Sequence, residues 1–244
     1  MSDINFTQDS RRWFQLGLLA LFAWVFVSLS PQTVRAETKP VQPPLVSEEQ
    51  AVDEKADRAR IVVLGDSLSA GYRLAPEEAF PVKLQKALDE RGVAVTIIGA
   101  GVSGDTTSGG LARLNWSVPE DADGVLIELG ANDALRGLPP ATTRSNLEAM
   151  ITKLKERSID VLLTGMLAPP NLGDQYAKEF NVIYADLAEK HDVLLYPFFL
   201  DGVVADPNLN LEDGIHPTAE GIDVIVSRIL PMVERFVERL RPSP

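Results

Sequence analysis

The sequence contains no cysteine and only two histidines, His191 and His216, among its 244 residues. The lack of cysteine excludes disulfides, thiolate metal sites and cysteine nucleophiles, and it leaves two candidates for any chemistry that needs an imidazole. Basic residues are also scarce, because 23 Lys and Arg stand against 35 Asp and Glu and give a formal net charge of −12. Nucleic-acid binding needs clustered Lys and Arg that neutralise phosphates, so we expect no nucleic-acid partner.

The N-terminal region differs from the rest of the chain in composition. Two arginines precede a nearly uninterrupted apolar run over residues 13–29, and Val34 and Ala36 follow as small residues at a cleavage site. This pattern predicts an export signal peptide over residues 1–36, so we expect a periplasmic or secreted protein. The apolar run is close to the lower limit of about 17 residues for a membrane span. The alternative is therefore an uncleaved signal that anchors the protein to a membrane through residues 13–29.

A second change of composition marks the start of the folded domain. Residues 37–59 are rich in proline and acidic side chains and poor in apolar ones. Such a segment cannot build a core, so we predict a solvated linker there. The remainder, residues 60–244, is long enough for one α/β domain.

Short apolar runs alternate with helical patterns throughout this domain. The expected strands cover residues 61–64, 93–98, 123–129, 160–164 and 193–196. The expected helices cover residues 80–91, about 105–114, 142–157, 174–190 and 217–240, the last with a kink at Pro231. Alternation of this kind predicts a five-stranded parallel sheet with helices on both faces. The fold class is therefore α/β, a flavodoxin-like three-layer α/β/α sandwich.

Residues suited to acyl transfer follow several of these strands. Ser67 comes directly after the first strand, and Gly104 and Asn132 follow the second and third. Because parallel strands end at the same edge of a sheet, we expect these residues to converge. A serine nucleophile also needs a base and an acid that orients the base. The three-residue spacing of Asp213 and His216 lets a turn bring the carboxylate to one imidazole nitrogen and leaves the other nitrogen for the serine.

Each of these signals has a structural alternative. Ser67 is equally suited to cap the next helix, and Asp-x-x-His before a helix is often a cap or a surface pair. His191 follows a helix with no glycine turn beside it, so we expect a surface residue at a helix end. The flanks of the serine also lack the G-x-S-x-G elbow of the α/β-hydrolases, so a different serine-hydrolase architecture is needed.

Four sequence blocks together resemble the GDSL, or SGNH, hydrolase family. In chain order they are Gly65-Asp-Ser-Leu-Ser-Ala-Gly-Tyr72, Gly101-Val-Ser-Gly-Asp-Thr106, Gly130-Ala-Asn-Asp133 and Asp213-Gly-Ile-His-Pro217. The resemblance covers about residues 60–240 and is closest to the bacterial exported thioesterase I, lysophospholipase and arylesterase group. It implies the SGNH hydrolase fold and an esterase/thioesterase that cleaves carboxylic esters and thioesters of acyl chains.

The resemblance also implies a role for each candidate residue. Ser67 would be the nucleophile, His216 the general base and then acid, and Asp213 the residue that orients the histidine. The oxyanion hole would use the backbone N–H groups of Ser67 and Gly104 and the side-chain amide of Asn132. No metal and no cofactor is implied.

Substrate-binding residues are predicted around this centre. We expect Leu167 and Pro169, in the loop after the fourth strand, to line an acyl groove. Arg73, Arg113 and Arg136 each follow a catalytic block, and our hypothesis is that one or more of them guides an anionic or zwitterionic head group. The alternative is that these arginines form ion pairs with surface acids.

The expected partner is a small-molecule acyl ester or thioester, with a membrane lipid such as a lysophospholipid as one candidate, and we expect a monomer. Two alternatives stay open. One is a carbohydrate acetylesterase on the same fold. The other is an exported ligand-binding module without catalysis, which the complete set of Ser67, Asp213 and His216 argues against.

Overall fold

The computed structural model describes residues 58–240 of the chain. The predicted signal peptide and nearly all of the predicted linker lie outside the described residues. Within the described range, the folded domain begins with a strand at Ala59, the last residue assigned to the linker. No helix in this part of the chain is long and apolar enough to cross a membrane.

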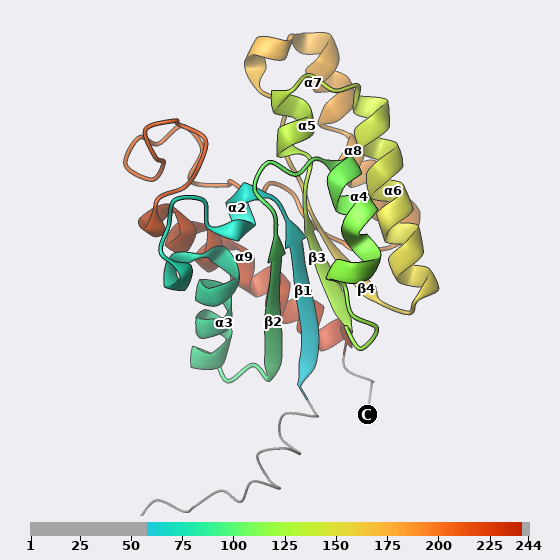
Figure 1. Ribbon diagram of the computed structural model, residues 1–244, viewed down its shortest axis with the longest axis vertical. Coiled ribbons are helices and arrows are strands. Elements are labelled where there is room, and N and C mark those ends of the chain that lie inside the picture. Colours follow the sequence, from blue (N-terminus) through green and yellow to red (C-terminus); the bar gives the residue numbers. More distant parts are fainter. Residues whose placement is uncertain (1–57, 241–244) are drawn as a thin grey trace, which may run out of the picture. The chain divides into compact units, whose positions relative to one another are not determined.

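A five-stranded parallel sheet forms the centre of the domain (Figure 1). Its strands are β1 (Ala59–Gly65), β2 (Val95–Gly101), β3 (Gly124–Glu128), β4 (Asp160–Thr164) and β5 (Leu194–Tyr196). The strand order β2-β1-β3-β4-β5 places β1 between β2 and β3. The predicted five-stranded parallel sheet is confirmed.

Helices cover both faces of this sheet and complete the predicted three-layer sandwich (Figure 1). The longer helices are α3 (Phe80–Glu90), α4 (Thr107–Ser117), α6 (Pro140–Glu156), α7 (Asp174–Phe180), α8 (Ile183–His191) and α9 (Ala219–Leu240). The short ones are α2 (Ser67–Ala70), α5 (Ala131–Leu135), and the 3-10 turns η1 (Pro76–Glu78) and η2 (Pro170–Leu172). Helix α3 packs against α9 on one face, and α6 packs against α4 and α8 on the other.

The core lies on both sides of β1. Ile61, Val62, Val63 and Leu64 are completely buried, as expected for a parallel strand that is covered on both faces. Helix α9 contributes nine buried residues, including the fully buried Phe236. Phe236 lies so close to β3 that a Cβ added at Gly124 would sit 2.7 Å from its ring.

The structure corrects three predicted boundaries. The helix predicted over 174–190 is two helices, α7 and α8, and the side chain of Asn181 at the break accepts the N–H of Ala168 at 2.8 Å. The last helix starts at Ala219 rather than Pro217, because Pro217 forms an antiparallel bridge with Asn210. The helix then continues through Pro231.

The third correction concerns β2, which extends to Gly101 instead of ending near residue 98. The two glycines that read as loop residues are strand residues without side chains. A Cβ at Gly101 would lie 2.6 Å from the backbone nitrogen of Ala70, and one at Gly99 would lie 3.3 Å from Pro81. Close packing of α2 and α3 on this edge strand therefore requires glycine at Gly101 and favours it at Gly99.

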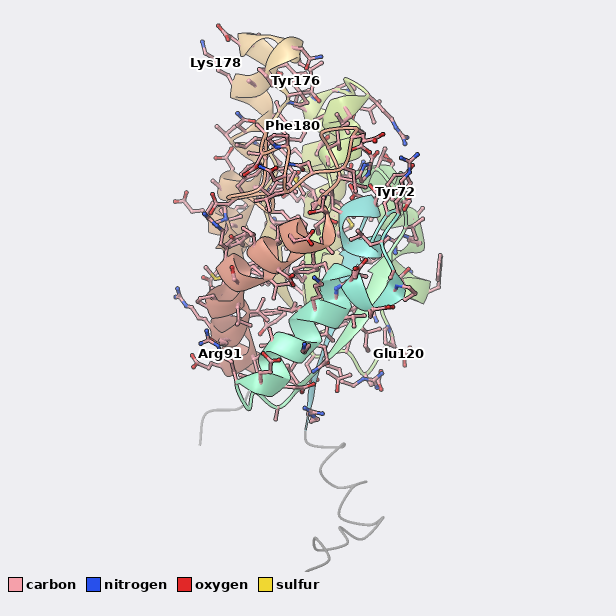
Figure 2. The ribbon with its side chains drawn as sticks, turned by 90° about the vertical axis from the view of Figure 1, so that its left-hand side faces the viewer. Tyr72, Arg91, Glu120, Tyr176, Lys178 and Phe180 are labelled. Carbon is pink, nitrogen blue, oxygen red and sulfur yellow. The ribbon has the colours of Figure 1, made fainter. Side chains whose placement is uncertain are left out.

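The two ends of the sheet carry different loops. Figure 2 shows Tyr72 and Tyr176 toward one end of the molecule, and Arg91 and Glu120 toward the other. The upper end in that view is the carboxyl edge of the sheet, where α2 comes after β1 and α5 comes after β3. This edge therefore gathers the loops of the candidate site.

Packing of α9 on the sheet predicts a large cost for truncating its buried aromatic residue. Phe236→Ala should lower the free energy of unfolding by about 3–5 kcal/mol, because it removes buried apolar surface and leaves a cavity. Urea unfolding measures this change. The control is Trp116→Ala, since Trp116 is 76% exposed and its loss should change stability by no more than about 0.5 kcal/mol. Equal losses for the two variants would contradict the packing.

Candidate active site

Ser67, His216 and Asp213 lie in hydrogen-bond contact with one another. The Nε2 atom of His216 is 2.9 Å from the Oγ atom of Ser67, and its Nδ1 atom is 2.8 Å from Oδ2 of Asp213. Ser67 is the first residue of α2 and is 8% exposed, so its hydroxyl is accessible at the surface of a cavity. The structure thus brings together three residues that the sequence separates by up to 149 positions.

A tight turn holds the Asp213 carboxylate. Its Oδ1 atom accepts the backbone N–H groups of Ile215 at 2.9 Å and His216 at 3.0 Å, which leaves Oδ2 for the imidazole. Burial raises the pKa of this carboxyl, but these two N–H groups and the His216 side chain outweigh burial and lower the pKa to about 2. Asp213 therefore stays ionised at every pH at which an esterase operates.

Tyr72 contacts the histidine from the side, which the sequence did not predict. Its ring centroid is 4.4 Å from that of His216, with the two planes at 37°. The guanidinium of Arg73 lies 5.2 Å from the centroid of the same tyrosine ring. Arg73 is exposed and stacks on Tyr72, and it is not among the residues that line the cavity described below.

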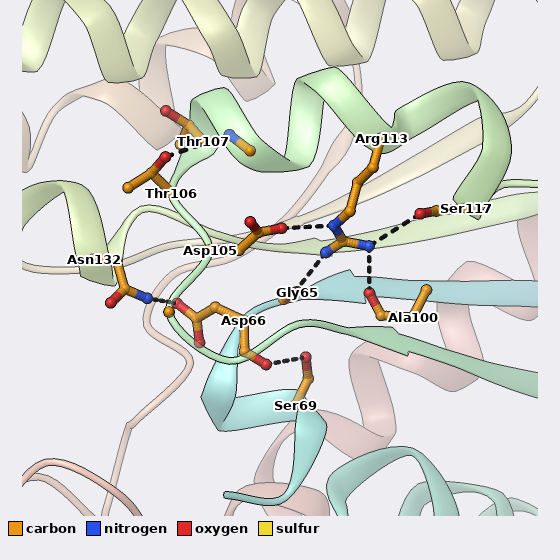
Figure 3. Close-up of polar contacts among 12 residues, drawn as sticks. Gly65, Asp66, Ser69, Ala100, Asp105, Thr106, Thr107, Arg113, Ser117 and Asn132 are labelled. Carbon is orange, nitrogen blue, oxygen red and sulfur yellow. Dashed lines mark hydrogen bonds and ion pairs between the residues drawn. The ribbon is translucent and has the colours of Figure 1, made fainter.

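A hydrogen bond joins Asp66, the residue before Ser67, to Asn132 (Figure 3). The side-chain amide of Asn132, in α5, donates to Oδ2 of Asp66 at 3.0 Å. Oδ1 of Asp66 accepts the N–H of Leu68 at 2.9 Å and thereby caps α2. Burial raises the pKa of Asp66 to about 6, although the hydrogen bonds from Leu68 and Asn132 act to lower it.

A buried glutamate lies directly beneath this pair. Glu128, the last residue of β3, is completely buried, and its Oε2 atom accepts the backbone N–H of Asp66 at 3.2 Å. Its Oε1 atom has no hydrogen-bond partner in the part of the chain that the structure describes. Burial raises the pKa of Glu128 well above its usual value, and the nearby charge of Asp66 raises it further.

Gly104 lies in the loop between β2 and α4, next to the nucleophile turn. The N–H of Val102, at the start of this loop, donates to the carbonyl of Gly65 at 3.0 Å. Gly104 has a φ of +82°, a conformation that favours glycine. The guanidinium of Arg136 donates to the carbonyl of Gly104 at 2.7 Å, so this exposed arginine ties the end of α5 to the loop.

For Arg113 the structure supports the ion-pair alternative and not a role toward a head group. Its side chain is 7% exposed and pairs with Asp105, with 2.6 Å between Nε and Oδ2 (Figure 3). Its two terminal nitrogens donate to the carbonyls of Ala100 at 2.7 Å and Gly65 at 2.8 Å. Arg113 therefore holds the ends of β1 and β2 together instead of meeting a substrate.

An apolar cavity of about 430 Å³ opens beside Ser67 and His216. Apolar side chains from several segments line it, among them Leu135, Met166, Leu167, Pro169, Leu200 and Val204. Leu167 and Pro169 are among the lining residues and Arg73 and Arg136 are not, while the role of all four in substrate binding stays a prediction. A larger hollow of about 780 Å³ lies between α3 and β2, and no member of the triad lines it.

The remaining histidine lies elsewhere. His191 is the last residue of α8, and its Nε2 atom is 3.3 Å from a carboxylate oxygen of Glu148. The predicted position at a helix end is confirmed, with the side chain 16% exposed. Over residues 58–240 no group of three or more His, Asp or Glu side chains is arranged to hold a metal ion.

Comparison with known proteins identifies the family. The sequence model of the GDSL-like Lipase/Acylhydrolase family matches residues 63–224. The chain belongs to this family. An arylesterase of Vibrio mimicus is 47% identical over 162 residues, which is 66% of this chain and 81% of that protein. The Escherichia coli K12 protein named thioesterase 1/protease 1/lysophospholipase L1 is 36% identical over 178 residues, which is 71% of this chain and 84% of that one.

Solved structures agree with the sequence comparison. The crystal structure of AlinE4, an SGNH-hydrolase family esterase, matches with a TM-score of 0.62 and 46% identity. The match covers 74% of this chain and 97% of that structure. The predicted family and SGNH fold are confirmed, and the chain is an ester-hydrolysing enzyme.

The contacts of Arg113 predict a structural effect of its removal. Arg113→Met should lower the free energy of unfolding by about 3–5 kcal/mol, because it leaves a half-buried carboxylate and two strand-end carbonyls without their donor. Urea unfolding checks this value. Arg144→Met is the matched control, because Arg144 forms an ion pair whose two side chains are 35% and 52% exposed, and its loss should cost no more than about 1 kcal/mol. Similar costs for both arginines would contradict the assignment.

Proposed function

We propose that the protein hydrolyses carboxylic esters and thioesters of acyl chains through an acyl-enzyme on Ser67. The contacts of His216, 2.9 Å to Oγ of Ser67 and 2.8 Å to Oδ2 of Asp213, are the observation that carries this proposal. Together they give a hydroxyl nucleophile a base within reach and hold that base in one orientation.

The reaction follows from this geometry in two halves. Oγ of Ser67 attacks the acyl carbonyl while its proton passes to Nε2 of His216, and the histidine then protonates the departing alcohol or thiol. Water next attacks the acyl-enzyme, with His216 as base, and Ser67 regains its proton as the acid leaves. Because Asp213 stays ionised, it stabilises the imidazolium that forms in both halves.

Three donors are assigned to the oxyanion. These are the backbone N–H groups of Ser67 and Gly104 and the side-chain amide of Asn132, which lines the same cavity as Ser67. The N–H of Leu68 at the start of α2 is taken up by Asp66, but that of Ser67 has no partner within the helix and can meet a developing negative charge. A donor of this kind typically contributes about 100- to 1000-fold to turnover.

The apolar cavity is the proposed binding site of the acyl chain. Each methylene buried there contributes about 0.8 kcal/mol. Its lining by leucine, methionine and proline side chains favours acyl groups longer than acetyl, which argues against a carbohydrate acetylesterase. The names of the relatives, an arylesterase and a thioesterase/lysophospholipase, are consistent with this choice.

Arg136 and Arg73 are the proposed contacts for a charged head group, such as that of a lysophospholipid. Both are exposed near the site, and Arg136 contacts the loop that carries Gly104. The guanidinium of Arg73 lies over the ring of Tyr72, and that ring also contacts the ring of His216. Neither lines the acyl cavity, which is consistent with a role toward the head group and not toward the chain.

We also propose that the protein is exported and that it is a monomer. The N-terminal pattern over residues 1–36 supports secretion or a periplasmic location, with anchoring through residues 13–29 if the signal is not cleaved. An uncharged or zwitterionic ester suits such a compartment better than acyl-CoA, whose negative charges a chain of net charge −12 does not attract.

A panel of p-nitrophenyl esters from acetyl to palmitoyl, with lysophospholipid and acyl-CoA alongside, tests the reaction. We expect wild type to hydrolyse the esters, and Ser67→Ala and His216→Ala to lower kcat by about 10⁴-fold or more, since these residues act as one unit. A serine-directed phosphonate should label wild type and leave Ser67→Ala unlabelled. A ligand-binding module would instead bind esters without turnover. Hydrolysis by Ser67→Ala at the wild-type rate would contradict the proposal.

The assignment of the acyl cavity predicts a change in chain-length preference. Leu167→Ser should lower kcat/KM for an octanoyl ester by about 3- to 10-fold and leave that for an acetyl ester nearly unchanged, because only the longer chain reaches this side chain. Steady-state kinetics on the two esters measures the ratio. Val82→Ser is the matched control, since Val82 is similarly exposed but lies on α3, and it should change kcat/KM for neither ester. An equal fall of kcat/KM on both esters in Leu167→Ser would contradict the assignment of the acyl chain to this cavity.

A further inference from the structure

We propose that Asp66 and Glu128 are positioning residues of the hydrolytic site. In this assignment Asp66 orients the side-chain amide of Asn132 toward the oxyanion, and Glu128 holds the backbone N–H of Asp66 itself. The proposal rests on the proposed function for its kinetic consequences, and on contacts independent of that function for its geometry.

The Asp66 carboxylate determines which way the Asn132 amide points. A carboxylate oxygen accepts hydrogen bonds, so the group 3.0 Å from Oδ2 of Asp66 must be the NH₂ of Asn132 and not its carbonyl. An amide NH₂ has two hydrogens, and Asp66 engages one of them. The other is then held in a fixed direction, and the carbonyl, which would repel an oxyanion, is turned away.

The same carboxylate also fixes the nucleophile turn. Its Oδ1 atom accepts the N–H of Leu68, the residue after Ser67, at 2.9 Å. One side chain therefore connects α2, which begins with the nucleophile, to α5, which holds the amide donor. Within residues 58–240, no hydrogen bond joins α2 directly to α5, so Asp66 provides the link between them.

Glu128 supports Asp66 from inside the core. It occupies the end of β3 in register with Gly65, and its Oε2 atom receives the N–H of Asp66 at 3.2 Å. A completely buried carboxyl whose second oxygen has no partner among the described residues is costly to keep, and an apolar side chain would fill the space more cheaply. The cost is explained if the acceptor for Asp66 is needed for the site.

The charges of the pair are consistent with these roles. Complete burial and the nearby charge of Asp66 raise the pKa of Glu128 well above its usual value, and hydrogen bonds from Asp66 and Ser69 only partly offset this, so Glu128 is the group that keeps its proton and Asp66 is the anion. Ionised Asp66 accepts from both Leu68 and Asn132, whereas protonation would turn one of its oxygens into a donor facing another donor. With a pKa of about 6, this arrangement is intact above pH 6 and is lost as the pH falls through that value.

Several charged and titratable groups face the pair from neighbouring elements. They are His216 before α9, Asp105 and Arg113 at α4, and Tyr184 in α8. His216 lowers the pKa of Asp66 and Asp105 raises it. His216 also titrates in its own right, so a pH experiment on the pair has to remove this residue.

A double-mutant cycle on kcat tests the link between Asp66 and Asn132. Asp66→Asn should lower kcat by about 10- to 100-fold with little change in KM, because the amide donor is misplaced. Asn132→Ala should lower kcat by about 100- to 1000-fold. If Asp66 acts through the amide, the double variant should resemble Asn132→Ala alone. Losses that multiply in the double variant would overturn the proposal.

Asp133→Asn is the matched control for this cycle. Asp133 is also a fully buried carboxylate and follows Asn132 in the chain, but its side chain accepts hydrogen bonds from Thr107 and Thr143 instead of from the Asn132 amide. Any loss of kcat that it causes should multiply with that of Asn132→Ala.

Glu128 is tested by two substitutions of similar size. Glu128→Gln keeps an oxygen acceptor for the N–H of Asp66 and should retain kcat within about 3-fold, whereas Glu128→Leu lacks the acceptor and should lose about 10-fold or more. Thermal unfolding of both variants separates stability from positioning, because a purely structural role moves kcat and Tm together. Equal kcat for the two variants would remove Glu128 from the proposal.

A readout without turnover separates this inference from the proposed function. In ¹⁵N-labelled His216→Gln protein, the side-chain amide signals of Asn132, identified by their absence in Asn132→Ala, should shift with pH around a midpoint above about 6, because this variant lacks the imidazole that lowers the pKa of Asp66. The added substitution Asp66→Asn should abolish that transition. Its persistence would overturn the proposal, and it would do so whether or not the wild type hydrolyses any ester.

Discussion

The parallel pairing of β1 with β2 and β3 is the constraint on which the site depends. It sets Gly65, the last residue of β1, level with Gly101 on one side and Glu128 on the other. The loops after these three strands therefore start side by side, and they carry Ser67, Gly104 and Asn132. Gly65 itself has no room for a side chain, because an added Cβ would lie 2.1 Å from Oγ of Ser69. The nucleophile turn is thus packed directly against the end of the sheet.

The polar groups beneath this edge keep it rigid in an otherwise apolar core. Arg113 donates to the carbonyls of Gly65 and Ala100 and so ties β1 to β2. Glu128 and Asp66 tie β3 to the nucleophile turn. The site consequently rests on hydrogen bonds between strand ends and not on the loops alone, which agrees with the need for donors that are in place before charge develops.

The carboxyl groups of the site are tuned in opposite directions by their surroundings. Asp213 is partly exposed and receives two backbone N–H groups, so its pKa falls to about 2 and it remains a charged partner for His216. Asp66 is buried and has a pKa of about 6, and burial likewise raises the pKa of Glu128 well above its usual value. The three carboxyl groups thus take different roles, because they differ in burial and in the number of hydrogen-bond donors that they accept from.

The sequence predicted the features that depend on local pattern. Four apolar residues before Gly65 are enough to recognise a buried strand, and the spacing of Asp213 and His216 is enough to suggest their contact. The family resemblance supplied the roles of these residues and of the oxyanion donors, which spacing alone left open. The structure places all the proposed triad atoms within hydrogen-bond distance.

Features that depend on distant contacts were missed. Arg113 reads like any surface arginine of a helix, because its partners at Gly65 and Ala100 are 48 and 13 residues away. Glu128 reads as the polar end of a strand, and its burial is visible only once β1 and α2 cover it. Tyr72 is a single aromatic residue after a glycine, and no periodic pattern indicates that its ring contacts the ring of His216.

Mass spectrometry of the acid-quenched enzyme can detect the proposed covalent acyl-enzyme on Ser67. Wild type mixed with p-nitrophenyl hexanoate should gain the mass of one hexanoyl group, and peptide mapping should place that group on Ser67. Turnover with the acyl group on another residue, or turnover by Ser67→Ala at the wild-type rate, would rule out Ser67 as the nucleophile.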